Sequence, residues 1–310
     1  MLKGRQTLSN WKGMGVNRMK KKKFALFLGC TIPARVQQFD RSARAVLDKL
    51  KVDVVDIREF NCCGYPMRNV DYKAYILFSA RNLALAEKQG LDIMTLCMCC
   101  FSSLKKANHV LKEDKPLRQE INSWLGKEHL TFNGDRKVTH FLSVLYHDVG
   151  QEKIKKNVIH PFKDLKIATH HGCHALRPSD IMQFDDPVAP VLFDTLVKTT
   201  GAQSIDWPLK LECCGAPLLG VNDDLSMDLT EKKLINAKGA GADYLCAACP
   251  WCQQQFDSVQ QMLNTRRKTD HHLPSILYPQ LLGLGMGIKG RLLGIKMNQM
   301  EITGIKAFLS

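Results

Sequence analysis

Cysteines in a repeated order are the residues of this chain that could do chemistry. The tripeptide Cys-Cys-Gly occurs twice, at 62–64 and at 213–215. A single cysteine precedes each copy and a Cys-x-x-Cys pair follows it, so each half of the chain offers five matched thiols. The first set is Cys30, Cys62, Cys63, Cys97 and Cys100, and the second set is Cys173, Cys213, Cys214, Cys249 and Cys252. Cys99 and Cys246 complete the twelve cysteines and lie outside the matched sets.

Thiolates that converge from separate loops bind zinc or an iron–sulfur cluster. A Cys-x-x-Cys pair alone is weak evidence, because it also fits a redox pair or half of a zinc site. Two adjacent cysteines are more informative, since neighbouring side chains diverge and can bind different metal atoms of a larger cluster. Each half also offers one thiol more than a zinc ion or a cubane needs. The arrangement favours an iron–sulfur site of unusual shape, with two four-cysteine zinc sites and buried spare cysteines as the alternative.

The composition indicates an intracellular globular protein. The chain has 310 residues, of which 45% are hydrophobic, so it can form a core without disulfide support. It contains no run of about 18 apolar residues that would indicate a membrane span. Thiols stay reduced in the cytoplasm, where twelve cysteines indicate metal ligands or redox groups rather than a disulfide framework. We therefore expect a cytoplasmic protein with no membrane-spanning segment.

Short apolar runs alternate with segments of helical periodicity in both halves. Strands are predicted at 24–29, 52–57, 91–96, 166–170, 203–206 and 244–248. Helices are predicted at 34–50, 72–88, from about 101, at 116–125, 139–147, 188–200, 225–238, 251–263 and 277–288. Such alternation is typical of a parallel sheet covered by helices, in which sites collect beyond the carboxyl ends of the strands.

The predicted fold class is therefore α/β, with two similar domains that each contain a small parallel sheet flanked by helices. The repeat further predicts that the domains are related by a pseudo-two-fold axis. We place a disordered tail at 1–19, a first domain with a helical extension at 20–158, and a second domain at 159–310.

The pattern Cys…Cys-Cys-Gly…Cys-x-x-Cys, present twice over about residues 23–302, resembles the cysteine-rich CCG domains of the heterodisulfide reductase B subunit family. The sequences at 97–101 (Cys-Met-Cys-Cys-Phe) and 249–252 (Cys-Pro-Trp-Cys) fit that family as well. The resemblance implies that each half holds a noncubane 4Fe–4S cluster through its matched set of five cysteines, one of them bridging.

The resemblance also implies an activity and partners. Reducing a disulfide takes two electrons, and two clusters held face to face could each bind one sulfur and supply one electron. The chain would be the catalytic iron–sulfur subunit of a heterodisulfide reductase-like complex, acting on a disulfide or thiol substrate. A ferredoxin-like C subunit and a flavoprotein A subunit would exchange electrons with it. The alternatives are an electron-transfer CCG subunit of a succinate, glycolate or lactate dehydrogenase complex, and a zinc-stabilised interaction protein.

Four other polar residues lie near the leading cysteines. His170 and His174 flank Cys173; we interpret His170 as a hydrogen-bonded packing residue, whereas His174 fits either packing or a contact with cluster or substrate sulfur. Arg35 and Arg177 each follow a leading cysteine by a few residues. They could attract an anionic substrate or simply be solvated at a helix start.

The positive charge is concentrated at the start of the chain. The net charge is +14, but residues 1–23 carry eight basic side chains and no acid, leaving +6 for the rest. Residues 1–19 lack a periodic apolar face, so we interpret them as disordered or as the result of a start codon assigned too early at Met1 rather than at Met19. A basic arm on nucleic acid or on an acidic partner is the alternative, and we expect no nucleic-acid partner.

A chain that begins at Met19 should keep the metal content and the thermal stability of the full chain, because residues 1–19 have no apolar face with which to dock. Metal analysis and thermal unfolding of the two chains check this. Loss of either property would show that the tail is an ordered part of the fold.

Overall fold

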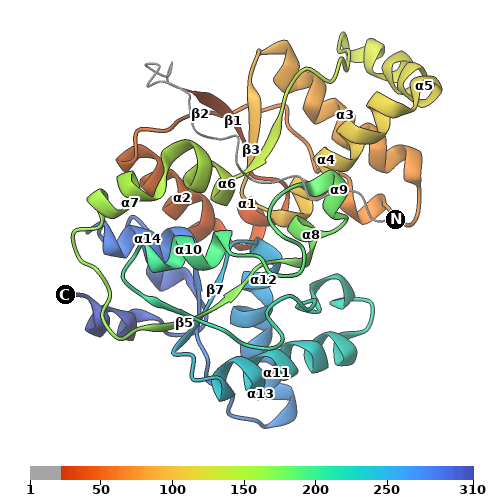
Figure 1. The fold of residues 1–310 in the computed structure, drawn as a ribbon. Coiled ribbons are helices and arrows are strands. Elements are labelled where there is room, and N and C mark those ends of the chain that lie inside the picture. Colours follow the sequence, from red (N-terminus) through yellow and green to blue (C-terminus); the bar gives the residue numbers. More distant parts are fainter. Residues whose placement is uncertain (1–21) are drawn as a thin grey trace, which may run out of the picture.

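Two four-stranded parallel sheets form the centre of the protein. The structure is a computed structural model that describes residues 22–310 (Figure 1). The first sheet has the order β2-β1-β3-β4, and the second repeats it as β6-β5-β7-β8. The strands of the first sheet are β1 (Lys23–Phe27), β2 (Asp53–Val55), β3 (Asp92–Thr95) and β4 (Val138–His140). Those of the second are β5 (Lys166–His170), β6 (Gln203–Ile205), β7 (Tyr244–Ala247) and β8 (Ser275–Leu277). This confirms the predicted α/β class with two similar halves.

Helices connect the parallel strands and cover both sheets. The helices of the first half are α1 (Thr31–Arg35), α2 (Gln37–Lys49), α3 (Tyr72–Lys88), α4 (Met98–Glu113), α5 (Lys115–Leu125), α6 (Phe141–Ser143) and α7 (Gln151–Asn157). Those of the second half are α8 (Cys173–Leu176), α9 (Ser179–Met182), α10 (Leu192–Lys198), α11 (Asp223–Gly239), α12 (Pro250–Gln254), α13 (Gln260–Arg267) and α14 (Tyr278–Gly285). Two π-helical segments, Val144–Val149 and Gln255–Val259, follow α6 and α12.

The central strands are buried on both faces, which is why they are continuous apolar runs rather than alternating ones. In β1 the last four residues are buried, and all four residues of β7 are buried. The parallel register pairs Phe27 with Thr95 in the first sheet and His170 with Ala247 in the second. These pairs bring the ends of neighbouring strands, and therefore the cysteines that follow them, to one edge of each sheet.

Reciprocal helix contacts join the halves. Helix α4, which follows β3, packs against α8, and its counterpart α12, which follows β7, packs against α1. Helix α2 packs against α14, and its counterpart α10 packs against α6. Each contact thus has a partner in which the roles of the halves are exchanged, as a pseudo-two-fold arrangement requires.

Helix α14, near the end of the chain, packs against the first half. All eight of its residues are buried, because they are apolar around the whole helix apart from Gln280. It lies against α2 of the first half (Figure 1). The guanidinium of Arg41 on α2 also donates to the carbonyl oxygen of Arg291 over 3.3 Å. One hydrophobic core runs through both halves as a result. The division at 158/159 therefore stays a prediction about repeat units.

Several predicted elements differ from the structure. The segment 139–147, expected to be helical, begins with strand β4, and 277–288 is preceded by strand β8. Both strands have three residues, too few for a sequence pattern to show. The predicted helix 34–50 is two helices that meet at Val36, whose φ of −135° and ψ of 48° are not helical. Helix α4 begins at Met98 rather than near Phe101, and the helix predicted from 251 is interrupted by the second π-helical segment.

Two further predictions concern the start of the chain and membrane-spanning segments. The predicted tail, 1–19, lies outside the described residues. Within residues 22–310, no helix has the length and apolarity that crossing a membrane requires.

Each Cys-Cys-Gly loop turns on its glycine. Gly64 has a φ of +83° and Gly215 a φ of +91°, the left-handed region that side chains rarely adopt. A Cβ atom at Gly64 would lie 2.8 Å from the Tyr75 carbonyl oxygen, and one at Gly215 would lie 2.7 Å from the Ser226 carbonyl oxygen. The loops therefore pass directly against the helices that follow them, α3 and α11.

Replacing either glycine with alanine should destabilise the protein by at least about 1–3 kcal/mol, because the left-handed backbone and the helix carbonyl both oppose a Cβ atom. Thermal unfolding of Gly64→Ala and Gly215→Ala checks this. Gly239→Ala is the matched control, because a Cβ atom there meets nothing within 4 Å. Equal melting temperatures for all three variants would contradict the proposed role of the turn.

Candidate metal centre

The cysteines are delivered by two kinds of element. Cys97 and Cys249 immediately precede helices α4 and α12 and have extended backbone conformations. The adjacent cysteines lie in the glycine loops, and a hydroxyl from the following helix holds each loop in place. Ser79 donates to the Cys63 carbonyl oxygen over 2.6 Å, and Thr230 donates to that of Cys214 over 3.2 Å.

The five thiols of each half follow one another in the same spatial order. In the first half Cys62 Sγ lies 3.8 Å from Cys30 Sγ. The thiols then interact in sequence along the first set, which runs Cys30, Cys62, Cys63, Cys100 and Cys97. They interact likewise along the second set, which runs Cys173, Cys213, Cys214, Cys252 and Cys249. The structure thus brings each matched set of five together.

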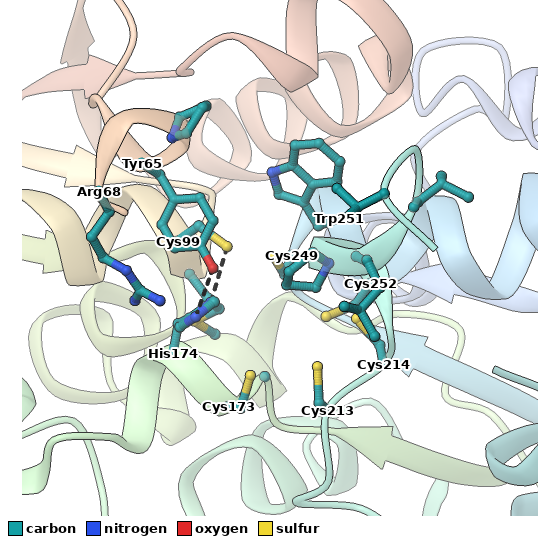
Figure 2. A pocket seen from close by; sticks show the side chains of 18 of the residues that line it. Tyr65, Arg68, Cys99, Cys173, His174, Cys213, Cys214, Cys249, Trp251 and Cys252 are labelled. Carbon is teal, nitrogen blue, oxygen red and sulfur yellow. Dashed lines mark hydrogen bonds between the residues drawn. The ribbon is translucent and has the colours of Figure 1, made fainter. Parts of the chain in front are cut away.

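The two sets meet at a junction. The Sγ atoms of Cys97, Cys99 and Cys249 all lie within 4.8 Å of one another, although Cys249 belongs to the other half. Cys99 Sγ is also 3.1 Å from Nδ1 of His174, and Nε2 of that ring is 3.3 Å from the Tyr65 hydroxyl oxygen (Figure 2). Cys99, which the sequence left without a partner, is therefore part of the contact between the halves.

Close packing of the thiols lowers the pKa of some cysteines and raises the pKa of their neighbours. The pKa of Cys213 is lowered to about 2, because the Cys173 and Cys214 thiols donate to its sulfur. The same contacts raise the pKa of Cys173, and that of Cys214 rises to about 12. In the first half, donation from Cys100 lowers the pKa of Cys63. Neighbouring thiolates repel one another, so all five in a set can ionise together only if bound cations compensate their charge.

A cavity of about 530 Å³ opens over the second set of cysteines. Figure 2 shows Tyr65 and Arg68 on one side of it and Trp251, Cys214 and Cys252 on the other. The first set borders a cavity of only about 20 Å³. The halves are thus similar in fold, but the second set of cysteines borders a much larger cavity than the first.

Substitutions at equivalent positions make the walls of the cavities differ in chemistry. In the Cys-x-x-Cys pairs, Cys99 of the first half corresponds to Trp251 of the second. Cys99 and Trp251 each line both cavities, so this pair of unlike residues lies between the two sets of cysteines. In the glycine loops, Arg68 corresponds to Leu219, and both line the large cavity. One wall of that cavity is therefore polar and the other apolar.

The other predicted site residues are less closely involved. His174 lines the large cavity, and burial lowers its pKa. Arg35 and Arg177 are exposed and lie outside the residues that line either cavity in the described chain. The sequence analysis did not identify Arg68 as a site residue, because the sequence of the glycine loop does not show in which direction its side chain points.

Cys246 is buried in strand β7 beside Thr169 and Ile276, where burial raises its pKa.

His170 is buried, as its interpretation as a packing residue requires. Its Nε2 lies 3.2 Å from the Glu212 carbonyl oxygen, and its ring is 5.0 Å from that of Phe256.

The donor set fits an iron–sulfur group rather than an oxygen-preferring metal. Each site consists of five thiols, each of which interacts with the next, and the adjacent cysteines of each loop take part side by side. The backbone also approaches closely: a Cβ atom at Gly29 would lie 2.7 Å from Cys100 Sγ. Soft thiolate ligands in this number suit iron–sulfur chemistry.

Fold and site together define a tandem cysteine-rich redox protein. The family described as CCG, cysteine-rich domain, matches residues 24–105 and again residues 167–257. The chain belongs to this family, in the branch of the heterodisulfide reductase B subunits.

Two curated relatives are similar along almost the whole chain. The B subunit of the ferredoxin/F420H2-dependent CoB-CoM heterodisulfide reductase of Methanosarcina acetivorans is 37% identical over 90% of this chain and 94% of its own length. The 8-methylmenaquinol:fumarate reductase membrane anchor subunit of Wolinella succinogenes is 33% identical over 91% of this chain and 98% of its own.

One solved structure is similar in fold, and this similarity carries no information about function. The crystal structure of a hypothetical protein from Helicobacter pylori superimposes with a TM-score of 0.73 at 20% identity. The match covers 92% of this chain and 53% of that one.

Proposed function

We propose that this chain is the catalytic iron–sulfur subunit of a heterodisulfide reductase-like complex, which interconverts a disulfide and two thiols. The observation that carries the proposal is the large cavity whose wall contains thiols of both halves, Cys99 from the first and Cys173, Cys213, Cys214, Cys249 and Cys252 from the second. A substrate sulfur in this cavity would lie directly beside the metal-binding cysteines.

Each matched set of five cysteines would hold one noncubane 4Fe–4S cluster. The support is the identical spatial order of the sets and the pairing of adjacent cysteines within each loop. When bound, such clusters supply single electrons and iron to which a substrate sulfur can bind. Cys99 and Cys246 lie outside these ligand sets.

The residues of the cavity would bind and orient the substrate. Conversion of a disulfide to two thiols consumes two electrons and two protons, and the electrons would come from partner subunits. Arg68 can hold an anionic arm of the substrate, and the apolar wall at Leu219 can hold a hydrocarbon arm. The His174 ring, fixed by Tyr65, can hydrogen-bond to a product thiolate. Because the large cavity serves only the second set, we place the disulfide there rather than one sulfur at each cluster.

The proposed partners follow from the family. A ferredoxin-like C subunit and a flavoprotein A subunit would exchange electrons with this chain. Its Gly-x-Gly-x-x-Gly match at 285–290 begins at the end of helix α14 rather than between a strand and a helix start, so it is not a dinucleotide-binding fingerprint. The complex would work in the cytoplasm, where thiols stay reduced.

An electron-transfer subunit of another oxidoreductase complex is the second candidate. Its support is the 33% identity with the Wolinella succinogenes membrane anchor subunit. Such a subunit would hold the same clusters and leave disulfides unreduced. A zinc-stabilised interaction protein is distinguished more simply, since it would hold zinc and no acid-labile sulfide.

The protein made without oxygen should hold about eight irons, and replacing either of two adjacent cysteines should remove about four, because adjacent thiolates would serve different irons. Iron, sulfide and zinc analysis of Cys62→Ser, Cys63→Ser, Cys213→Ser and Cys214→Ser checks this, with Cys99→Ser and Cys246→Ser as controls that retain iron. Loss of one cluster should abolish disulfide reduction by reduced methyl viologen rather than halve it. Zinc without sulfide, or iron-loaded protein that reduces no disulfide, would contradict the proposal.

Arg68→Met should raise the KM for a carboxylated disulfide such as dithiodiglycolate about tenfold or more, because a hydrogen bond to a charged group contributes about 1.5–3 kcal/mol. The KM for the uncharged 2-hydroxyethyl disulfide should change little. Arg35→Met and Arg177→Met are matched controls, since both side chains are exposed outside the cavity. Equal effects on both substrates would exclude Arg68 as the anion-binding residue.

A further inference from the structure

A buried lysine lies behind the second set of cysteines. Lys233, on helix α11, is 1% exposed. Its ammonium group donates to the Leu209 carbonyl oxygen and lies 5.1 Å from the centre of the Trp207 ring. Among the ion pairs of residues 22–310, none pairs Lys233 with a carboxylate. A cation without an anion is costly to bury, so its position needs a physical reason.

The ionisable groups around Lys233 are mainly cysteine thiols. Burial lowers its pKa to about 8, and the groups that oppose this are Cys214 and Cys252 first, followed by Glu212 and Cys213. Glu212 is exposed, so water screens its charge. His170 also faces the lysine and is buried, where burial and the lysine charge both lower its pKa. Thr230, one turn earlier on α11, donates to the Cys214 carbonyl oxygen, so Lys233 lies behind the loop of the second set. The cysteines of that set become thiolates when they bind a metal.

The first half has no charge at this position. Counted from the glycine of each loop, Lys233 corresponds to Asn82 on helix α3. The Asn82 amide donates to the Cys62 and Phe78 carbonyl oxygens over 3.2 and 2.9 Å, and it accepts from the Asn61 backbone over 2.9 Å. Asparagine thus supports the first loop with neutral hydrogen bonds, whereas lysine brings a positive charge to the second.

We propose that Lys233 raises the reduction potential of the cluster held by the second half above that of the cluster in the first half. The inference rests on the proposed function, in which both clusters are present. A fixed positive charge in a medium of low dielectric constant stabilises the more negative, reduced state of a nearby cluster. An electron then passes favourably from the first cluster to the second, with no bond made or broken. The second set of cysteines borders the large cavity, so reducing equivalents supplied by a partner subunit would collect where the substrate would bind.

A redox titration of the complete protein, followed by electron paramagnetic resonance, tests this. Two midpoint potentials are expected in the unaltered protein, and Lys233→Met should lower the higher one while leaving the other unchanged. Lys232→Met is the matched control, because it removes the same charge from the next, exposed position of the same helix. Lys233→Arg, which keeps the charge, should keep the higher potential near its original value.

The outcomes separate this inference from the proposed function. Protein with about eight irons whose potentials are the same in Lys233→Met would overturn the inference and leave the function standing. Equal shifts in Lys233→Met and Lys232→Met would also overturn it, since they would reflect net charge alone. If Lys233→Met loses iron, retention in Lys233→Arg supports the role of the charge, and loss in both shows a purely structural role. Absence of iron and sulfide from the unaltered protein would refute the function itself.

Discussion

Mutual repulsion among closely packed thiolates is the constraint on which the rest of this structure depends. Ten thiols cannot be held in two groups by flexible segments, because each would move away from its ionised neighbours. The fold resists this with strand ends, helix starts and two glycine loops that are fixed against helices α3 and α11. Bound metal would supply the positive charge that makes the crowded arrangement favourable.

Duplication of the domain explains the similarity of the halves, and a few substitutions explain their difference. Trp251 stands where the other half has Cys99, and Lys233 stands where it has Asn82. The first pair lies between the two sets, since Cys99 and Trp251 each line both cavities. The second pair gives the accessible set a buried cation. The large cavity and the buried cation both belong to the second set, so the two sets of cysteines differ in access and in charge.

Much of the fold could be predicted from the sequence, because long apolar runs and amphipathic helices have strong periodic signals. Strand β5 and helix α3 match their predicted ranges. The thiols of each cysteine set lie next to one another in the structure. Strands β4 and β8 could not be predicted, since three residues are too few to show a distinctive pattern. The direction of Arg68 and the position of Trp251 depend on contacts between the halves, which single-chain periodicity does not encode.

The packing of α14 on α2 also sets an order for biosynthesis. A ribosome completes the whole first sheet and its cysteines long before residues 278–285 emerge. Until then α2 lacks the helix that covers it, and the first half has an unfilled apolar face. Cys97 likewise lacks its neighbour across the junction until Cys249 has been made. The apolar face of α2 is therefore covered only after the second half has been made, so the first half completes its core last.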